Sequence, residues 1–112
     1  MYEMSKHVDT FFVAGFQHND GALVFDQLKV GKKIQLVPEP DNPYDPTAVA
    51  LFFDKTKIGY VPRDNNSLIA LLAHYGHEDV FECRILQVNP EADPWEQVRV
   101  GIYVTDARKK DE

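Results

Sequence analysis

The sequence predicts a small α+β fold that is mainly β, with five or six short strands, two helices and a partly closed barrel. Short segments rich in β-branched and aromatic residues, several with alternating apolar side chains, recur along the chain. Two further stretches have the apolar spacing and the cap residues of helices. A length of 112 residues points to one domain that can bury a core without disulfides or metals.

Six segments have the composition or the alternation of β-strands. They cover residues 10–17, 33–37, 47–53, 57–61, 80–88 and 98–104. The third is apolar on both faces, which predicts a central, covered strand. Residues 54–56 are expected to form the hairpin turn that follows it. In the fifth, Phe81, Cys83 and Ile85 are expected to point inward.

Residues 20–28 and 64–75 are predicted to be helical. In the second segment, Asp64 suits the N-cap, and Gly76 lies where a left-handed residue commonly ends a helix. The apolar residues of this segment fall on one predicted face, which comprises Leu68, Leu71, Leu72 and Tyr75. Outside residues 10–104, the termini at 1–9 and 105–112 are expected to be flexible.

The chain is acidic, with 18 acidic against 12 basic residues and a formal charge of −6. This balance argues against a protein that holds DNA by overall charge alone. A nucleic-acid partner would have to be bound by specific contacts at one local site. No apolar run reaches the length of a membrane span, and no signal peptide opens the chain. These features predict a cytoplasmic protein with no membrane partner.

No pattern predicts catalysis or a cofactor, because glycine-rich phosphate loops, nucleophile elbows and paired carboxylates are missing. His74 and His77 have a spacing that suits a metal, but no second ligand pair follows, so no metal is expected. Cys83 is interpreted as a small buried hydrophobe. Trp95 is interpreted as a packed hairpin aromatic, with a binding role as the alternative.

Residues 38–49, PEPDNPYDPTAV, hold four of the seven prolines of the chain. Because proline fixes φ and lacks a backbone donor, this segment is predicted to be a rigid loop that exposes Tyr44. The side-chain oxygens of Asp41, Asn42 and Asp45 are expected to accept hydrogen bonds from nearby backbone amides.

Three stretches together resemble the HIRAN domain, in its free-standing bacterial form. They are FFVAGFQHNDG at 11–21, LKVGKKIQLVPEPDNPYDPTAVALFF at 28–53 and KIGYVPRDN at 57–65. The resemblance covers roughly residues 10–104, and its most specific part is EPDNPYDPTAV followed by IGYVPR. It implies a modified OB-like barrel, which in eukaryotic helicase-like repair ATPases captures the 3′ end of single-stranded DNA.

By this resemblance, Asp45 accepts a hydrogen bond from the terminal 3′-hydroxyl, with Asn42 and Tyr44 beside it. Tyr60 presents its ring to the DNA, and Arg63 contacts a backbone phosphate. An equal alternative is that the loop only caps the barrel, with Asp45 bonded to the backbone of its own turn.

The sequence departs from the family pattern at three positions. His18 and Asn19 replace two adjacent tyrosines that stack on bases, and an amide is a poor stacking surface. Pro38 replaces an arginine that many members carry. These departures predict weaker binding than in the repair ATPases.

The leading hypothesis is a non-enzymatic module that recognises single-stranded DNA 3′ ends, aided by a local basic rim. The rim residues are Lys29, Lys32, Lys33, Lys55, Lys57 and Arg63. The alternative is an acidic adaptor that docks to a separately encoded helicase or nuclease. A metal-dependent hydrolase is a distant third.

Overall fold

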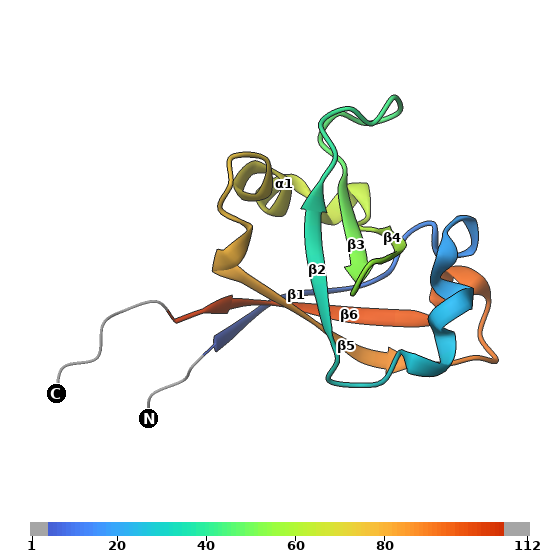
Figure 1. Cartoon of the computed structure of the whole chain (residues 1–112). Helices are drawn as coiled ribbons and strands as arrows, with labels where there is room; N and C mark the ends of the chain where they lie inside the picture. The colour runs from blue at the N-terminus through green and yellow to red at the C-terminus, as the bar shows by residue number, and fades with distance from the viewer. Residues whose placement is uncertain (1–4, 107–112) are drawn as a thin grey trace, which may run out of the picture.

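A six-stranded antiparallel sheet organises residues 5–106, which are the residues that the computed structural model describes (Figure 1). The strands are β1 (Ser5–Phe12), β2 (Lys33–Pro38), β3 (Val49–Phe53), β4 (Thr56–Tyr60), β5 (Phe81–Val88) and β6 (Val98–Thr105). Two helical segments of eight residues accompany the sheet, the 3-10 helix η2 (Asp20–Gln27) and the α-helix α1 (Ser67–His74). Residues 5–106 also contain four 3-10 turns of three residues each: η1 (Phe16–His18), η3 (Arg63–Asn65), η4 (Glu78–Val80) and η5 (Pro94–Glu96).

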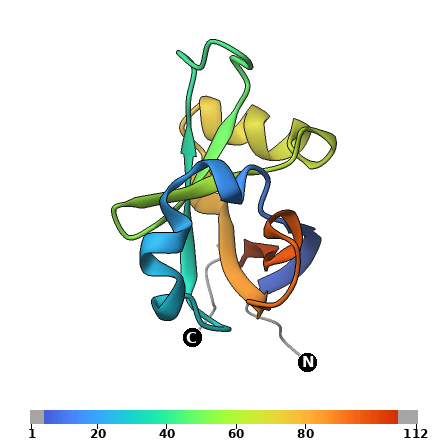
Figure 2. The same ribbon diagram turned by 90° about the vertical axis from the view of Figure 1, so that its right-hand side faces the viewer.

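The strand order is β1-β6-β5-β2-β3-β4, so β1 and β4 are the two edges. The edges meet at one point only, where Ala14 and Tyr60 form an isolated bridge with reciprocal backbone hydrogen bonds of 2.9 and 2.8 Å. Figure 2 shows the segment after β1, in blue, crossing beside β4. The sheet is therefore not closed into a barrel, and this part of the prediction is wrong. Gly15, at φ 69°, turns the chain away from β4 directly after the bridge.

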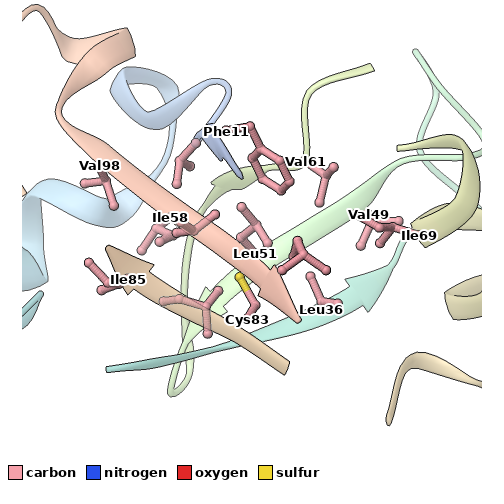
Figure 3. Close-up of a cluster of buried hydrophobic side chains, with 14 of the residues drawn as sticks. Phe11, Leu36, Val49, Leu51, Ile58, Val61, Ile69, Cys83, Ile85 and Val98 are labelled. Atoms are coloured by element: carbon pink, nitrogen blue, oxygen red, sulfur yellow. The ribbon is translucent and has the colours of Figure 1, made fainter. Parts of the chain in front are cut away.

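The core lies between the curved sheet and the segments that cover it. Leu51, Ile58 and Ile85 have no exposed surface and converge from β3, β4 and β5 (Figure 3). Cys83 and Ile85 point inward as predicted, and β3 is a central strand with only Phe52 partly exposed. Burial of this apolar surface supplies the main stabilising free energy of the fold.

The first strand lies earlier in the chain than the predicted segment 10–17. It begins at Ser5 because the pairing with β6 runs from Ser5 to Phe12, and it ends before Ala14 because that residue pairs with β4. The termini at 1–9 and 105–112 are expected from the sequence to be flexible. Of these residues, 1–4 and 107–112 lie outside the described part of the chain. Within the described part, Ser5 to Asp9 and Thr105 belong to strands.

Helix α1 lies against β2 and β3, and it differs from its prediction at its start and in its buried face. Asp64 lies in η3, whereas the N-cap is Asn66. The helix ends as predicted, with Gly76 at φ 87, and the amides of Gly76 and His77 bond to the carbonyls of Ala73 and Leu72.

The buried face of α1 consists of Ile69, Ala70 and Ala73, whereas Leu68 and Leu71 of the predicted face are more than half exposed. The small residues allow the helix to lie close to the sheet, which leaves the larger leucines outside. Within residues 5–106, no helix combines the length and apolar character that crossing a membrane requires.

Gly59 is required by the bridge between the sheet edges. A Cβ at this position would lie 2.5 Å from the carbonyl oxygen of Ala14, whereas a Cβ at Gly31 would meet nothing within 4 Å. Both glycines have positive φ, 158° at Gly59 and 91° at Gly31.

We expect Gly31→Ala to lower the free energy of unfolding by about 1–2 kcal/mol, because alanine is strained at positive φ. Gly59→Ala should lower it by that amount and by roughly 1–3 kcal/mol more from overpacking against Ala14. Urea denaturation measures both, and equal losses would contradict the steric argument.

Candidate nucleic-acid interface

The proline-rich loop projects from the sheet between the end of β2 and the start of β3, at the top of Figure 1. Its tip is folded by Asn42, whose Oδ1 accepts hydrogen bonds from the backbone amides of Tyr44 (2.9 Å) and Asp45 (3.0 Å). At its base, the amide of Glu39 donates to the carbonyl of Ala48 at 2.9 Å. The loop therefore has a defined geometry, and Tyr44 is 86% exposed at its tip.

Asp45 uses its two carboxylate oxygens differently. Oδ1 accepts hydrogen bonds from the backbone amide and the hydroxyl of Thr47, at 2.9 and 2.7 Å. Oδ2 lies 3.6 Å from the guanidinium Nε of Arg63 and accepts no hydrogen bond from the described residues. The bonds from Thr47 and the nearby Arg63 hold the pKa of Asp45 below its ordinary value of 3.8, so this carboxylate is ionised at neutral pH.

Both sequence hypotheses for Asp45 therefore find a counterpart in the geometry. One oxygen bonds the turn of the loop, as the capping alternative requires, and the other remains available as an acceptor. Arg63 also donates from its guanidinium NH2 group to the carbonyl of Tyr44 at 3.0 Å, while its side chain stays 73% exposed.

The hydroxyl of Tyr60 is held by a group of polar side chains, Glu39, Asn42 and Lys57, which we call the Glu39 cluster. Its hydroxyl donates to Oε1 of Glu39 at 2.8 Å and accepts from Nζ of Lys57 at 3.0 Å. Lys57 also pairs with Oε2 of Glu39 at 2.7 Å, and Asn42 Nδ2 donates to Oε1 at 3.1 Å. Burial alone acts to raise the pKa of Glu39, but the bonds from Lys57, Tyr60 and Asn42 outweigh it and lower the pKa below 4.5.

All seven residues singled out from the sequence line one concavity of about 400 Å³. They come from three segments, the turn after β1 (His18, Asn19), the proline-rich loop (Asn42, Tyr44, Asp45) and the end of β4 with η3 (Tyr60, Arg63). The Ala14–Tyr60 bridge brings the first segment to the third, and the Glu39 cluster ties the second to the third.

The two residues that replace the family tyrosines differ in their surroundings. His18 is exposed, and no hydrogen bond to its side chain is found among the described residues. Asn19 donates from Nδ2 to the carbonyl of Gly15 at 2.8 Å, so its amide closes the turn after β1. His18 is therefore the one of the pair that presents an accessible ring.

The expected basic rim does not form around this concavity. Lys29, Lys32 and Lys33 lie at the start of β2, the end opposite to the proline-rich loop, and Lys55 lies in the β3–β4 hairpin turn. Lys57 is neutralised by Glu39. Of the six rim residues, only Arg63 presents an accessible charge at the concavity, because the strand directions separate the lysines in space.

Sequence reasoning missed Glu39, Lys57 and His74 as supports of the site. Glu39 and Lys57 are 18 residues apart, and only the pairing of β2, β3 and β4 brings them together. His74 was considered as a metal ligand, whereas its Nε2 lies 2.9 Å from the carbonyl oxygen of Ala48 and anchors the base of the loop.

Other candidate groups have no role at this concavity. No cluster of three metal-ligating side chains is found in residues 5–106. Burial raises the pKa of the Cys83 thiol to about 12, which disfavours the nucleophilic thiolate. Trp95 is 56% exposed on η5, so its interpretation as a packed hairpin aromatic is wrong.

Comparisons with known proteins identify a family from the sequence and similar folds among solved structures. The family model for the HIRAN domain matches residues 8–105. A protein from Lactobacillus plantarum has a similar structure, with a TM-score of 0.72 and 22% identity over 89% of this chain and 94% of that chain. The HIRAN domain of human HLTF aligns with a TM-score of 0.63 and 13% identity, over 89% of this chain and 78% of that chain. No curated protein sequence matches the chain.

The Glu39 cluster makes stability depend on pH. Because the folded state lowers the pKa of Glu39, the stabilisation is present above pH 4.5 and is lost as pH falls through the lower, folded value. We expect Glu39→Gln to cost about 1–2 kcal/mol at pH 7, since charged hydrogen bonds are lost, and less at pH 3, where a larger share of the wild-type carboxyl is protonated.

Urea denaturation at both pH values measures this difference. The matched control is Glu91→Gln, because Glu91 is exposed and its carboxylate makes no hydrogen bond within residues 5–106. A cost of Glu39→Gln that does not change between pH 7 and pH 3 would show that the carboxylate charge does not support the cluster.

Proposed function

This chain belongs to the HIRAN domain family, whose members are in general non-catalytic DNA-binding modules, and on that premise we propose that it binds the 3′ end of single-stranded DNA. The observation that carries the proposal is the carboxylate of Asp45. It is ionised and held in place through Oδ1, while Oδ2, which lies 3.6 Å from Nε of Arg63, accepts no hydrogen bond from residues 5–106.

A 3′-hydroxyl is a suitable partner for this oxygen because it is a neutral donor at the end of a chain. An ionised acceptor forms a stronger hydrogen bond with it than a neutral acceptor would. A phosphate at the same position would instead bring a second negative charge close to Asp45. The paired and stacked end of a duplex does not present its last nucleotide to a concavity of about 400 Å³.

The aromatic side chains around Asp45 supply surfaces for bases. Tyr44 is exposed, His18 has an accessible ring, and the ring of Tyr60 lines the concavity while its hydroxyl is held by Glu39 and Lys57. Stacking contributes roughly 1–3 kcal/mol per base and tolerates any sequence. We therefore propose recognition of the end of the strand without strong base preference.

Electrostatic attraction contributes little to this binding. Arg63 is the exposed cation that adjoins Asp45, and it is placed for a backbone phosphate. The chain carries a formal charge of −6, and the other exposed rim lysines lie away from the concavity. Binding thus depends on short-range contacts and on the preorganised loop, which lowers the ordering cost of association.

The first prediction from this proposal concerns the terminal group. We expect single strands with a 3′-hydroxyl to bind at least about tenfold more tightly than those with a 3′-phosphate, and blunt duplex to bind most weakly. Fluorescence anisotropy at low salt with a 5′-labelled oligonucleotide measures the three affinities.

The matched variant for this experiment is Asp45→Asn, which keeps an oxygen for Thr47 and removes the charge. It should lower the melting temperature slightly, because the bonds from Thr47 and the pairing with Arg63 lose the negative charge, and it should shrink the gap between the 3′-hydroxyl and the 3′-phosphate. An unchanged gap in Asp45→Asn would remove Asp45 from the site, and equal binding of all three ligands by the wild type would exclude end recognition.

The second prediction concerns Arg63. Arg63→Ala should weaken binding to all sequences alike and make the plot of log affinity against log salt shallower by about 0.7, the share of one single-strand phosphate. Lys29→Ala is the control, because this exposed lysine lies at the opposite end of β2. If both variants have the wild-type slope, Arg63 makes no phosphate contact.

A further inference from the structure

A second hollow lies on the other side of the proline-rich loop from the Asp45 concavity. It has a volume of about 650 Å³ and separates the loop from α1. Pro46 and Thr47 form its loop wall, and Asn66, Ala70, Leu71 and Tyr75 form its helix wall. We call this hollow the α1 groove.

The α1 groove opens onto an apolar surface that the described residues leave uncovered. Leu68 is 51%, Leu71 57% and Tyr75 75% exposed. Leu68 and Leu71 lie one turn apart on α1 and Tyr75 is the C-cap one turn further, so the three form a continuous ridge beside the groove. Single exposed apolar residues are common, but a ridge next to a groove is typical of an interaction site.

Asn66 gives an independent indication of a ligand. It is the buried polar residue of the described core, only 8% exposed, and it lines the α1 groove. Its backbone bonds to Arg63 and Ala70, but its side chain makes no hydrogen bond with any described residue. The amide of Asn66 therefore has its donor and its acceptor unused at the wall of the groove, where a ligand that supplies both a donor and an acceptor could bind to it.

The charge of the chain indicates what kind of ligand this is. No lysine or arginine lines the α1 groove, and Arg63 lines the Asp45 concavity instead. Because the chain carries a formal charge of −6, a phosphate backbone and a second copy of the chain would be disfavoured here, whereas a basic segment would be attracted.

We infer that the α1 groove binds an extended segment of a partner protein that places an apolar side chain between Pro46 and Leu71. The backbone of an extended segment offers the C=O and N–H that pair with the amide of Asn66. A lysine or arginine beside the apolar residue is favoured by the formal charge of −6 on the chain. This inference does not rest on DNA-end binding, because Leu71 and Asn66 do not line the Asp45 concavity.

The proline-rich loop forms a wall of both sites, so the α1 groove and the Asp45 concavity lie next to each other. Pro46 and Thr47 face the α1 groove, while the preceding Asp45 and the following Ala48 line the concavity. His74 lines the groove and its ring nitrogen contacts the carbonyl of Ala48. A partner bound in the α1 groove would therefore be held next to the proposed DNA end.

Peptide selection tests the inference. A random peptide library displayed on phage is selected on the whole wild-type protein, and the enriched peptide is synthesised with a fluorescent label. We expect a common motif of an apolar residue next to lysine or arginine. Anisotropy should then show at least about tenfold weaker binding to Leu71→Lys, which replaces the apolar wall with a repelling charge.

Two further variants complete the design. Leu23→Lys is the matched control, because Leu23 is a 77% exposed leucine on η2, and it should bind the peptide like the wild type. Asn66→Ala should bind more weakly at an unchanged melting temperature, since the side-chain amide makes no hydrogen bond with the residues that the structure describes. Oligonucleotide affinity, measured in parallel, should not fall in Leu71→Lys.

Several results would overturn the inference. They are a selection without a common motif, an acidic motif, or a peptide that binds Leu71→Lys as tightly as wild type. A wild-type dimer that Leu71→Lys converts to monomer would assign the α1 groove to self-association. A loss of oligonucleotide binding in Leu71→Lys would assign it to nucleic acid.

Discussion

The backbone bridge between Ala14 and Tyr60 is the contact on which the arrangement of the candidate site depends. It joins the two edges of the sheet at one point and places the turn with His18 beside the end of β4. Only a residue without a side chain fits at position 59, because the carbonyl of Ala14 occupies the space of a Cβ. The site is thus assembled where the barrel stays open, with backbone hydrogen bonds fixing two of its three segments.

The third segment, the proline-rich loop, is held by polar anchors on each side. Asn42 folds the tip, the Glu39 cluster ties it to Tyr60, and His74 contacts the carbonyl of Ala48 at its base. These bonds are made before any ligand arrives. A loop ordered in advance spends less free energy on binding, which matters for a chain whose charge of −6 gives little electrostatic attraction to DNA.

The sequence predicted the features that local chemistry determines and missed those that depend on distant pairing. The alternation in β5 and the left-handed Gly76 were correct, because period and cap residues act locally. The buried face of α1 was wrong, since close packing selected the alanines over the larger leucines. The Glu39–Lys57 pair and the separation of the rim lysines follow from strand order, which no local pattern encodes.

The most direct test of the account is to locate the 3′ end of a bound strand on the protein. Paramagnetic relaxation in NMR measures this with a spin label on the second base from the 3′ end, which leaves the hydroxyl intact, compared with a label at the 5′ end. The account predicts that the 3′-side label broadens the amides of Tyr44, Asp45 and Tyr60, while the 5′ label leaves them sharp. Equal broadening by both labels, or broadening at the far end of β2, would contradict it.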